Sequence, residues 1–170
     1  AGANALRPVA AKLAAGIGAL CRDPETRQPT FAELLDAAFD RLKAKLPFPE
    51  ERKSAIAREL EGVRTAVGCL RLAVTDPFFS EPESGEKGSG ELLTLALDPA
   101  ACKGCGLCVR ACEAGALQTR RQGVQSLAQA RQVRRAWEGL PDNQAATIQR
   151  LRRHPEVAAL ATTLLAAPAA

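Results

Sequence analysis

Four cysteines crowd into eleven residues of this 170-residue chain, and their spacing restricts what the region can fold around. They follow the pattern C-x2-C-x2-C-x3-C and are Cys102, Cys105, Cys108 and Cys112. The other two cysteines, Cys21 and Cys69, stand alone. Disulfide-stapled secreted domains are usually shorter and spread their cysteines through the loops. The clustering therefore predicts a metal site in a reducing compartment, which favours a cytoplasmic protein.

The spacing is that of the bacterial run that holds a [4Fe–4S] cluster. Such a cluster needs a thiolate at each of four corners, and Gly104 and Gly106 allow the tight turns, since glycine adopts positive φ without steric cost. Backbone amides and the cation of Lys103 would stabilise the added electron. Zinc sites usually pair two C-x2-C elements across a longer spacer, and such short spacings rarely form disulfides. A zinc-stabilised helical interaction module and a structural cluster in a nucleic-acid enzyme stay as alternatives.

Residues 92–117 resemble a ferredoxin-type [4Fe–4S] half-module, in which a strand, the cluster loop, a helix and a second strand follow one another. The resemblance implies an α+β fold, a mainly helical chain with a ferredoxin-like βαβ cluster-binding module. The sequence departs from the family at Glu113, where proline usually follows the fourth cysteine.

More loosely, the helical segments and the extension beyond the motif resemble the iron–sulfur region of 2-oxoacid:ferredoxin (pyruvate:ferredoxin-like) oxidoreductases. This resemblance implies electron transfer through one cluster, as a module or subunit of a larger oxidoreductase. Its partners would be other domains or subunits, with an acidic ferredoxin or flavodoxin as a further one. The sequence contains no Gly-Asp-Gly motif for thiamine diphosphate, so that chemistry would lie outside these residues.

A degenerate internal repeat suggests which cysteine is the fourth ligand of the cluster. Residues 65–74 align with residues 108–117, which places Cys69 on Cys112, as if a two-cluster ferredoxin had lost the other ligands of its first motif. In two-cluster ferredoxins the fourth cysteine of a run ligates the other cluster. We therefore predict that Cys69 completes the site held by Cys102, Cys105 and Cys108, with local closure by Cys112 as the alternative. Cys21 is expected to be a packing cysteine. Six thiols cannot ligate two clusters, so one is expected.

The rest of the chain reads as three regions. We expect a helical region at 1–68, the ferredoxin-like module at 69–119 with a flexible polar loop at 80–90, and a basic helical segment at 120–170. Thr30 and Glu33 have the form of a capping box before an apolar helical stripe. Residues 91–98 alternate in polarity and are expected to form a strand. Later prolines are expected to break the helical pattern that begins near residue 126.

Charge and composition exclude several functions. Residues 119–156 carry eight arginines against three acidic side chains, a surface that could face an acidic protein, nucleic acid or water. The absence of tyrosine argues against a base-stacking surface, and no apolar run is long enough to span a membrane. No acid–base pair, activated nucleophile or phosphate loop is visible, so we assign no catalytic residue and leave open whether this chain is an enzyme. His154 is expected to be a surface group.

Overall fold

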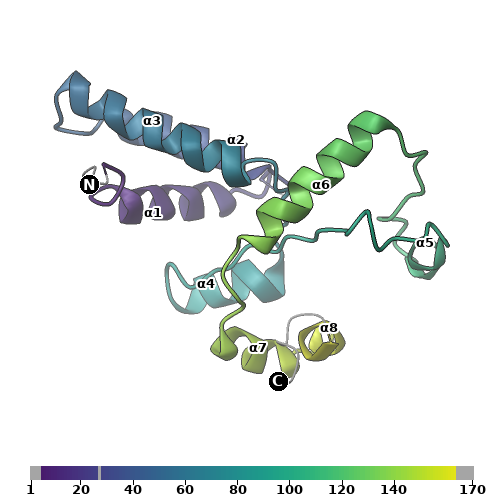
Figure 1. The fold of residues 1–170 in the computed structure, drawn as a ribbon. Coiled ribbons are helices and arrows are strands. Elements are labelled where there is room, and N and C mark those ends of the chain that lie inside the picture. The colour runs from purple at the N-terminus through teal and green to yellow at the C-terminus, as the bar shows by residue number, and fades with distance from the viewer. Residues whose placement is uncertain (1–4, 27, 164–170) are drawn as a thin grey trace.

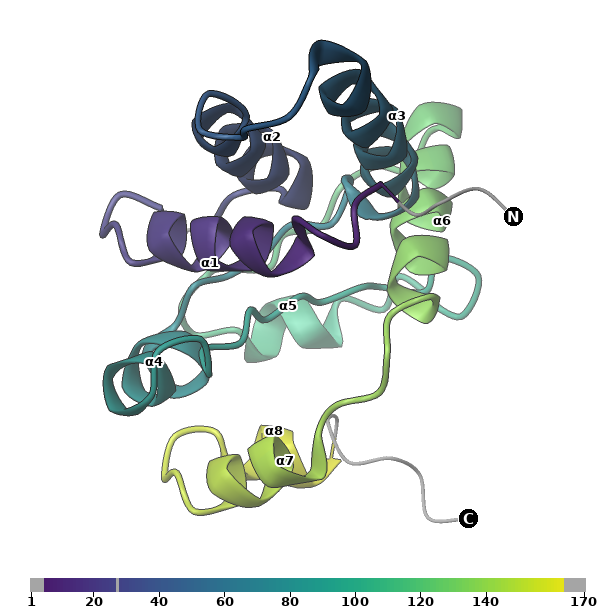
Figure 2. The ribbon, with the colours of Figure 1, turned by 90° about the vertical axis from the view of Figure 1, so that its left-hand side faces the viewer.

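The computed structural model describes residues 5–26 and 28–163, and this part of the chain is mainly helical, as expected. Helices α1 (Ala10–Cys21), α2 (Phe31–Lys43) and α3 (Glu50–Val67) lie side by side at one end of the molecule (Figures 1 and 2). Their apolar stripes bury a first core cluster. It consists of Val9, Leu13, Leu35, Ala38, Leu46, Ile56 and Leu60.

The predicted capping box fixes the start of α2. The backbone N–H of Glu33 donates to Oγ1 of Thr30 at 3.3 Å, and the backbone N–H of Thr30 donates to Oε2 of Glu33 at 2.7 Å. The backbone hydrogen bond from Thr30, followed by the one from its hydroxyl, lowers the pKa of Glu33. Two backbone N–H groups that the helix itself leaves free are thereby satisfied.

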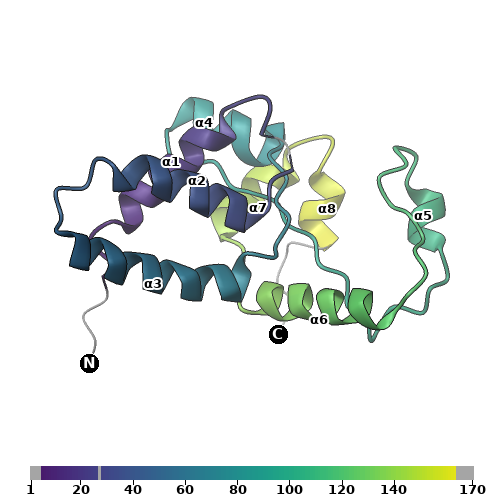
Figure 3. The ribbon, with the colours of Figure 1, turned by 90° about the horizontal axis from the view of Figure 1, so that it is seen from above.

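A second core cluster joins segments that are far apart in the sequence. Its contributors include a short π-helical turn, η1 (Asp76–Ser80), and the long helix α6 (Val124–Glu138). Helix α6 crosses the molecule next to the end of α3 (Figures 1 and 3). The buried members of the cluster are Cys21, Leu34, Leu70, Leu72, Phe79 and Ala136. The basic helix therefore packs on the N-terminal helices.

The last two helices, α7 (Ala145–Arg152) and α8 (Ala158–Thr163), pack on η1 through Phe78, Leu151 and Ala161. Arg150 donates to the carbonyl oxygen of Pro77 at 2.5 Å. His154 is half-buried after α7, and its Nε2 lies 3.3 Å from Oε1 of Glu81. The expected surface histidine therefore faces a carboxylate of another segment.

The predicted α+β class and its βαβ module are wrong: the part of the chain that the structure describes contains isolated β-bridges but no strand and no sheet. Ala73 and Leu93 exchange backbone hydrogen bonds of 2.8 and 3.2 Å, and a second bridge joins Thr30 and Arg71. Beyond Leu93 the alternating segment has no partner strand in the described chain. A strand needs a neighbour for its backbone groups, so alternation alone did not produce one here.

The polar segment at 80–90, where the sequence predicted a flexible loop, contains a short helix. Residues Glu81–Gly85 form a short helix, α4, and Glu83 within it is buried. Within the described ranges, no helix combines the length and the apolarity needed to cross a bilayer.

Candidate metal centre

The cysteine run lies on a projecting segment, which we call the cysteine arm (residues 95–118). It contains one short helix, α5 (Leu107–Ala111), and residues 119–123 connect it to α6. In Figures 1 and 3, α5 stands well away from the helices of the body. Within the described stretch 95–135, no side chain is buried. The arm is therefore held by its own local interactions.

Asp98 begins the cysteine loop by capping a turn. Its Oδ1 accepts hydrogen bonds from the backbone N–H groups of Ala100 at 2.8 Å and Ala101 at 3.3 Å. Its carbonyl oxygen accepts one from the N–H of Cys102 at 3.0 Å. The cysteine spacing does not predict this role, but an aspartate before proline is a common turn former and so carries a sequence signal of its own.

The two glycines between the cysteines have the backbone conformation expected of them. Gly104 has φ of 65°, and Gly106, at the N-cap of α5, has φ of 72°. These values lie in the left-handed region, which costs a side-chain-bearing residue about 1–2 kcal/mol. The loop therefore uses glycine at two positions between its cysteines where a residue with a side chain would be strained.

The thiols of the run differ in their surroundings. Cys102, Cys105 and Cys108 are exposed, whereas Cys112 is half-buried at the end of α5. The Sγ atom of Cys112 accepts a hydrogen bond from the backbone N–H of Ala116 at 3.2 Å. Hydrogen bonds to cysteine sulfurs are among the features that set the potential of an iron–sulfur cluster.

Cys69 and Cys21 lie elsewhere. Cys69 follows α3 and packs against the second core cluster, to which the buried Cys21 belongs. Burial raises the pKa of Cys21, because the thiolate would lose its hydration; the nearby Arg22 offsets part of this rise. The four cysteines of the run therefore lie on one arm, while Cys69, the fourth ligand that the sequence favoured, lies half-buried against the second core cluster of the body.

Among the described residues, no three side chains of Cys, His, Asp or Glu are gathered closely enough to hold a metal ion. The donor set nevertheless fits an iron–sulfur cluster, because four thiols stand on a short segment with left-handed glycines and no competing histidine or disulfide. We expect the loop to close around the metal group, since a site of this kind rarely exists preformed.

Comparison with known proteins identifies the same segment. Residues 95–118 match the family model of the 4Fe-4S binding domain. No curated protein and no solved structure matches the chain. The match supports a ferredoxin-type [4Fe–4S] segment, and with it iron–sulfur electron transfer in general, which confirms that part of the sequence interpretation.

Proposed function

We propose that this chain transfers single electrons through one [4Fe–4S] cluster, as a module or subunit of a larger oxidoreductase. The observation that carries the proposal is the family match over residues 95–118, which falls on an exposed arm that holds all four cysteines of the run. A cluster of this kind accepts and donates one electron at a time when bound. The chain supplies the ligands, the amides and the surface through which a partner approaches.

The ligands that we propose are Cys102, Cys105, Cys108 and Cys112. The position of Cys69 among the apolar side chains of the second core cluster supports Cys112 over Cys69 as the fourth ligand. With Cys21 buried in the same cluster, only the four thiols of the run remain for metal binding, which supports one cluster per chain.

The site would be assembled in a reducing, cytoplasmic setting, where thiols persist. The larger enzyme that we favour is a 2-oxoacid:ferredoxin oxidoreductase, whose other domains or subunits would carry the thiamine chemistry. An acidic ferredoxin or flavodoxin would receive the electrons. The charge distribution supports an acidic partner. Residues 95–140 carry seven basic and three acidic side chains, so their net charge of +4 equals that of the whole chain.

Metal analysis of the anaerobically prepared chain tests the cluster. We expect about four iron and four acid-labile sulfide per chain, a brown colour and reversible reduction by dithionite. A zinc-to-chain ratio near one, with no iron, would instead support the zinc module.

Three serine variants test the ligand set. Cys112→Ser should lose iron and change the spin signal of the reduced cluster, whereas Cys69→Ser should retain both. Cys21→Ser is the matched control, because it alters a buried thiol of the same core cluster as Cys69. Full occupancy in the Cys112 variant with loss in the Cys69 variant would restore the ligand set that the sequence favoured.

Charge reversal tests the partner. Exchanging Arg131, Arg134 and Arg135 of α6 for glutamate should slow reduction of an acidic ferredoxin, and the effect should shrink as salt rises. The control reverses Arg41, Lys43 and Lys45, three exposed charges that lie at the far end of α2 and just beyond it, at the opposite side of the molecule from α5 (Figure 1). Equal rates for both triple variants at low ionic strength would contradict docking on α6.

A further inference from the structure

The cysteine arm exposes apolar side chains that the described part of the chain leaves uncovered. Four leucines on the arm have relative solvent exposures of 46–70%. They are Leu95, Leu97, Leu107 and Leu117. Of the large apolar side chains that the described residues expose, most lie on this arm or directly after it. Uncovered apolar groups concentrated on one projection mark a surface that another molecule covers.

The fourth thiol of the arm is set apart from the other three. Cys102, Cys105 and Cys108 are exposed, while the sulfur of Cys112 is turned toward the backbone N–H of Ala116, four residues onward. A cluster held by the first three thiols still needs a fourth ligand, and the hydrogen bond from Ala116 leaves sulfur lone pairs of Cys112 for iron. The body offers Cys69 and Cys21, of which Cys21 is buried in the second core cluster and Cys69 is half-buried against it.

Proteins with two such cysteine runs obtain the fourth ligand by exchange between the runs. The fourth cysteine of each run ligates the cluster that the other run holds. This chain contains one run. A second run is available wherever a second copy of the chain is present. A two-fold pair makes the exchange reciprocal, because each contact in it occurs twice.

The charge of the arm permits two copies to meet. Asp98 and Glu113 balance Lys103 and Arg110, so residues 95–118 carry no net charge. The excess positive charge begins beyond the arm, at Arg120 and Arg121. Two metal-free arms can therefore bring their apolar surfaces together without net repulsion, and each arm offers two basic and two acidic side chains to the other.

We infer that two copies of this chain pair through their cysteine arms and that Cys112 of each copy completes the cluster held by Cys102, Cys105 and Cys108 of the other. The pair carries two clusters, one per chain. Each thiol releases its proton to water as it binds iron, so the four ligands are thiolates. The inference rests on the proposed function and adds to it the partner and the assembly of the site.

Complementation between two full-length variants tests the exchange. The acceptor is Cys112→Ala, and the donor carries Cys102→Ala, Cys105→Ala and Cys108→Ala with Cys112 intact. Each is reconstituted anaerobically with ferrous iron and sulfide, alone and mixed in equal amounts. Neither should form a four-iron cluster alone, whereas random pairing in the mixture should restore about a quarter of the wild-type cluster content per chain. Iron, sulfide and the spin signal after reduction are the readouts.

The control donor also carries Cys112→Ala and should restore nothing. A wild-type protein that binds a full cluster while the mixture does not would overturn the inference and leave the proposed function standing. A wild-type protein without a cluster would overturn both. The mass of the wild-type holoprotein by sedimentation is independent of any variant: we expect two chains per particle, and a fully loaded single chain would overturn the exchange.

Discussion

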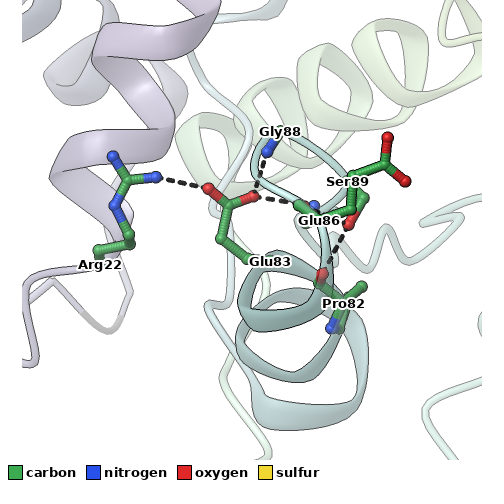
Figure 4. Close-up of polar contacts among 7 residues, drawn as sticks. Arg22, Pro82, Glu83, Glu86, Gly88 and Ser89 are labelled. Atoms are coloured by element: carbon green, nitrogen blue, oxygen red, sulfur yellow. Dashed lines mark hydrogen bonds and ion pairs between the residues drawn. The ribbon is translucent and has the colours of Figure 1, made fainter.

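Arg22 at the end of α1 donates to Oε1 of Glu83 in α4 at 2.5 Å and so ties together segments 61 residues apart (Figure 4). The other carboxylate oxygen of Glu83 accepts hydrogen bonds from the backbone N–H groups of Gly88 at 2.8 Å and Gly90 at 3.2 Å. The side chain of Glu83 is only 6% exposed. A buried carboxylate requires such partners, and here they order a polar segment that composition alone suggested was flexible.

Loss of this carboxylate should destabilise the fold. We expect Glu83→Gln to lower the free energy of unfolding by about 1–3 kcal/mol, because the amide cannot accept from both backbone groups and Arg22 as the carboxylate does. Arg22→Ala should cost less, since the Arg22 side chain is 46% exposed and the two backbone hydrogen bonds remain. Chemical denaturation followed by circular dichroism measures both.

A matched control is Arg64→Ala. Arg64 pairs with Asp36 and Glu61, and all three side chains are about half exposed or more. Exposed pairs contribute at most about 1 kcal/mol. If Glu83→Gln were no more costly than Arg64→Ala, the buried hydrogen bonds of Glu83 would not contribute as described.

The same group predicts a pH dependence of stability. Burial alone would raise the pKa of Glu83, but the hydrogen bonds from Gly88 and Gly90 and the pairing with Arg22 outweigh it and lower that pKa. A carboxyl with a lowered pKa in the folded state stabilises the protein above its unfolded pKa of about 4.3, and this contribution is lost as the pH falls through the folded value. The difference in unfolding free energy between wild type and Glu83→Gln should therefore shrink below about pH 4.3. A difference that stays constant from neutral to strongly acidic pH would contradict the assignment.

The left-handed backbone of Gly106 predicts that a side chain at this position destabilises the cysteine loop. Gly106→Ala should accelerate loss of iron to a chelator, because alanine at φ of 72° costs about 1–2 kcal/mol of the folded loop. Gly62→Ala is the control, since Gly62 lies exposed within α3 and its added Cβ would meet nothing within 4 Å. That change should stabilise the helix by about 0.5–1 kcal/mol and leave the rate of iron release unchanged. Equal iron release from both variants would contradict a role for the left-handed turn.

Metal binding should order the arm. Trypsin has cleavage sites in the arm at Lys103 and Arg110 and just beyond it at Arg120, and none of these side chains is buried. We expect the metal-free chain to be cut there first and the iron-loaded chain to be protected, because the cluster supplies the core that the arm lacks. Arg58 within α3 serves as an internal reference for global unfolding. Identical cleavage with and without iron would show that the arm is ordered independently of its ligands.

Local signals explain which features the sequence could predict. The capping box of Thr30 and Glu33 needs only neighbours three residues apart, and helix breaks near Pro141 and Pro155 follow from the geometry of proline. The run of four cysteines is equally local, and the family match covers the same residues. In each case the signal lies in residues that are close together in the sequence.

The features that the sequence did not predict depend on contacts between distant segments. Residues 91–98 alternate in polarity, as a strand does, but in the structure this segment pairs only through one β-bridge, between Leu93 and Ala73. The alternation alone could not predict how far the pairing would extend. Composition could not show that Glu83 would be buried against Arg22.

The sequence by itself therefore determined the longer helices, the capping box of α2 and the cysteine run that matches the 4Fe-4S family model, because periodicity, capping and cysteine spacing are properties of residues close together in the chain. Only the tertiary structure decided that Cys69 lies half-buried against the second core cluster while the cysteine run stands on a projecting arm (Figure 1). The physical reason is that burial depends on the packing of apolar faces from distant segments, here α1, α2, α6 and the segment after α3. A local sequence pattern does not contain the information about which faces pack together.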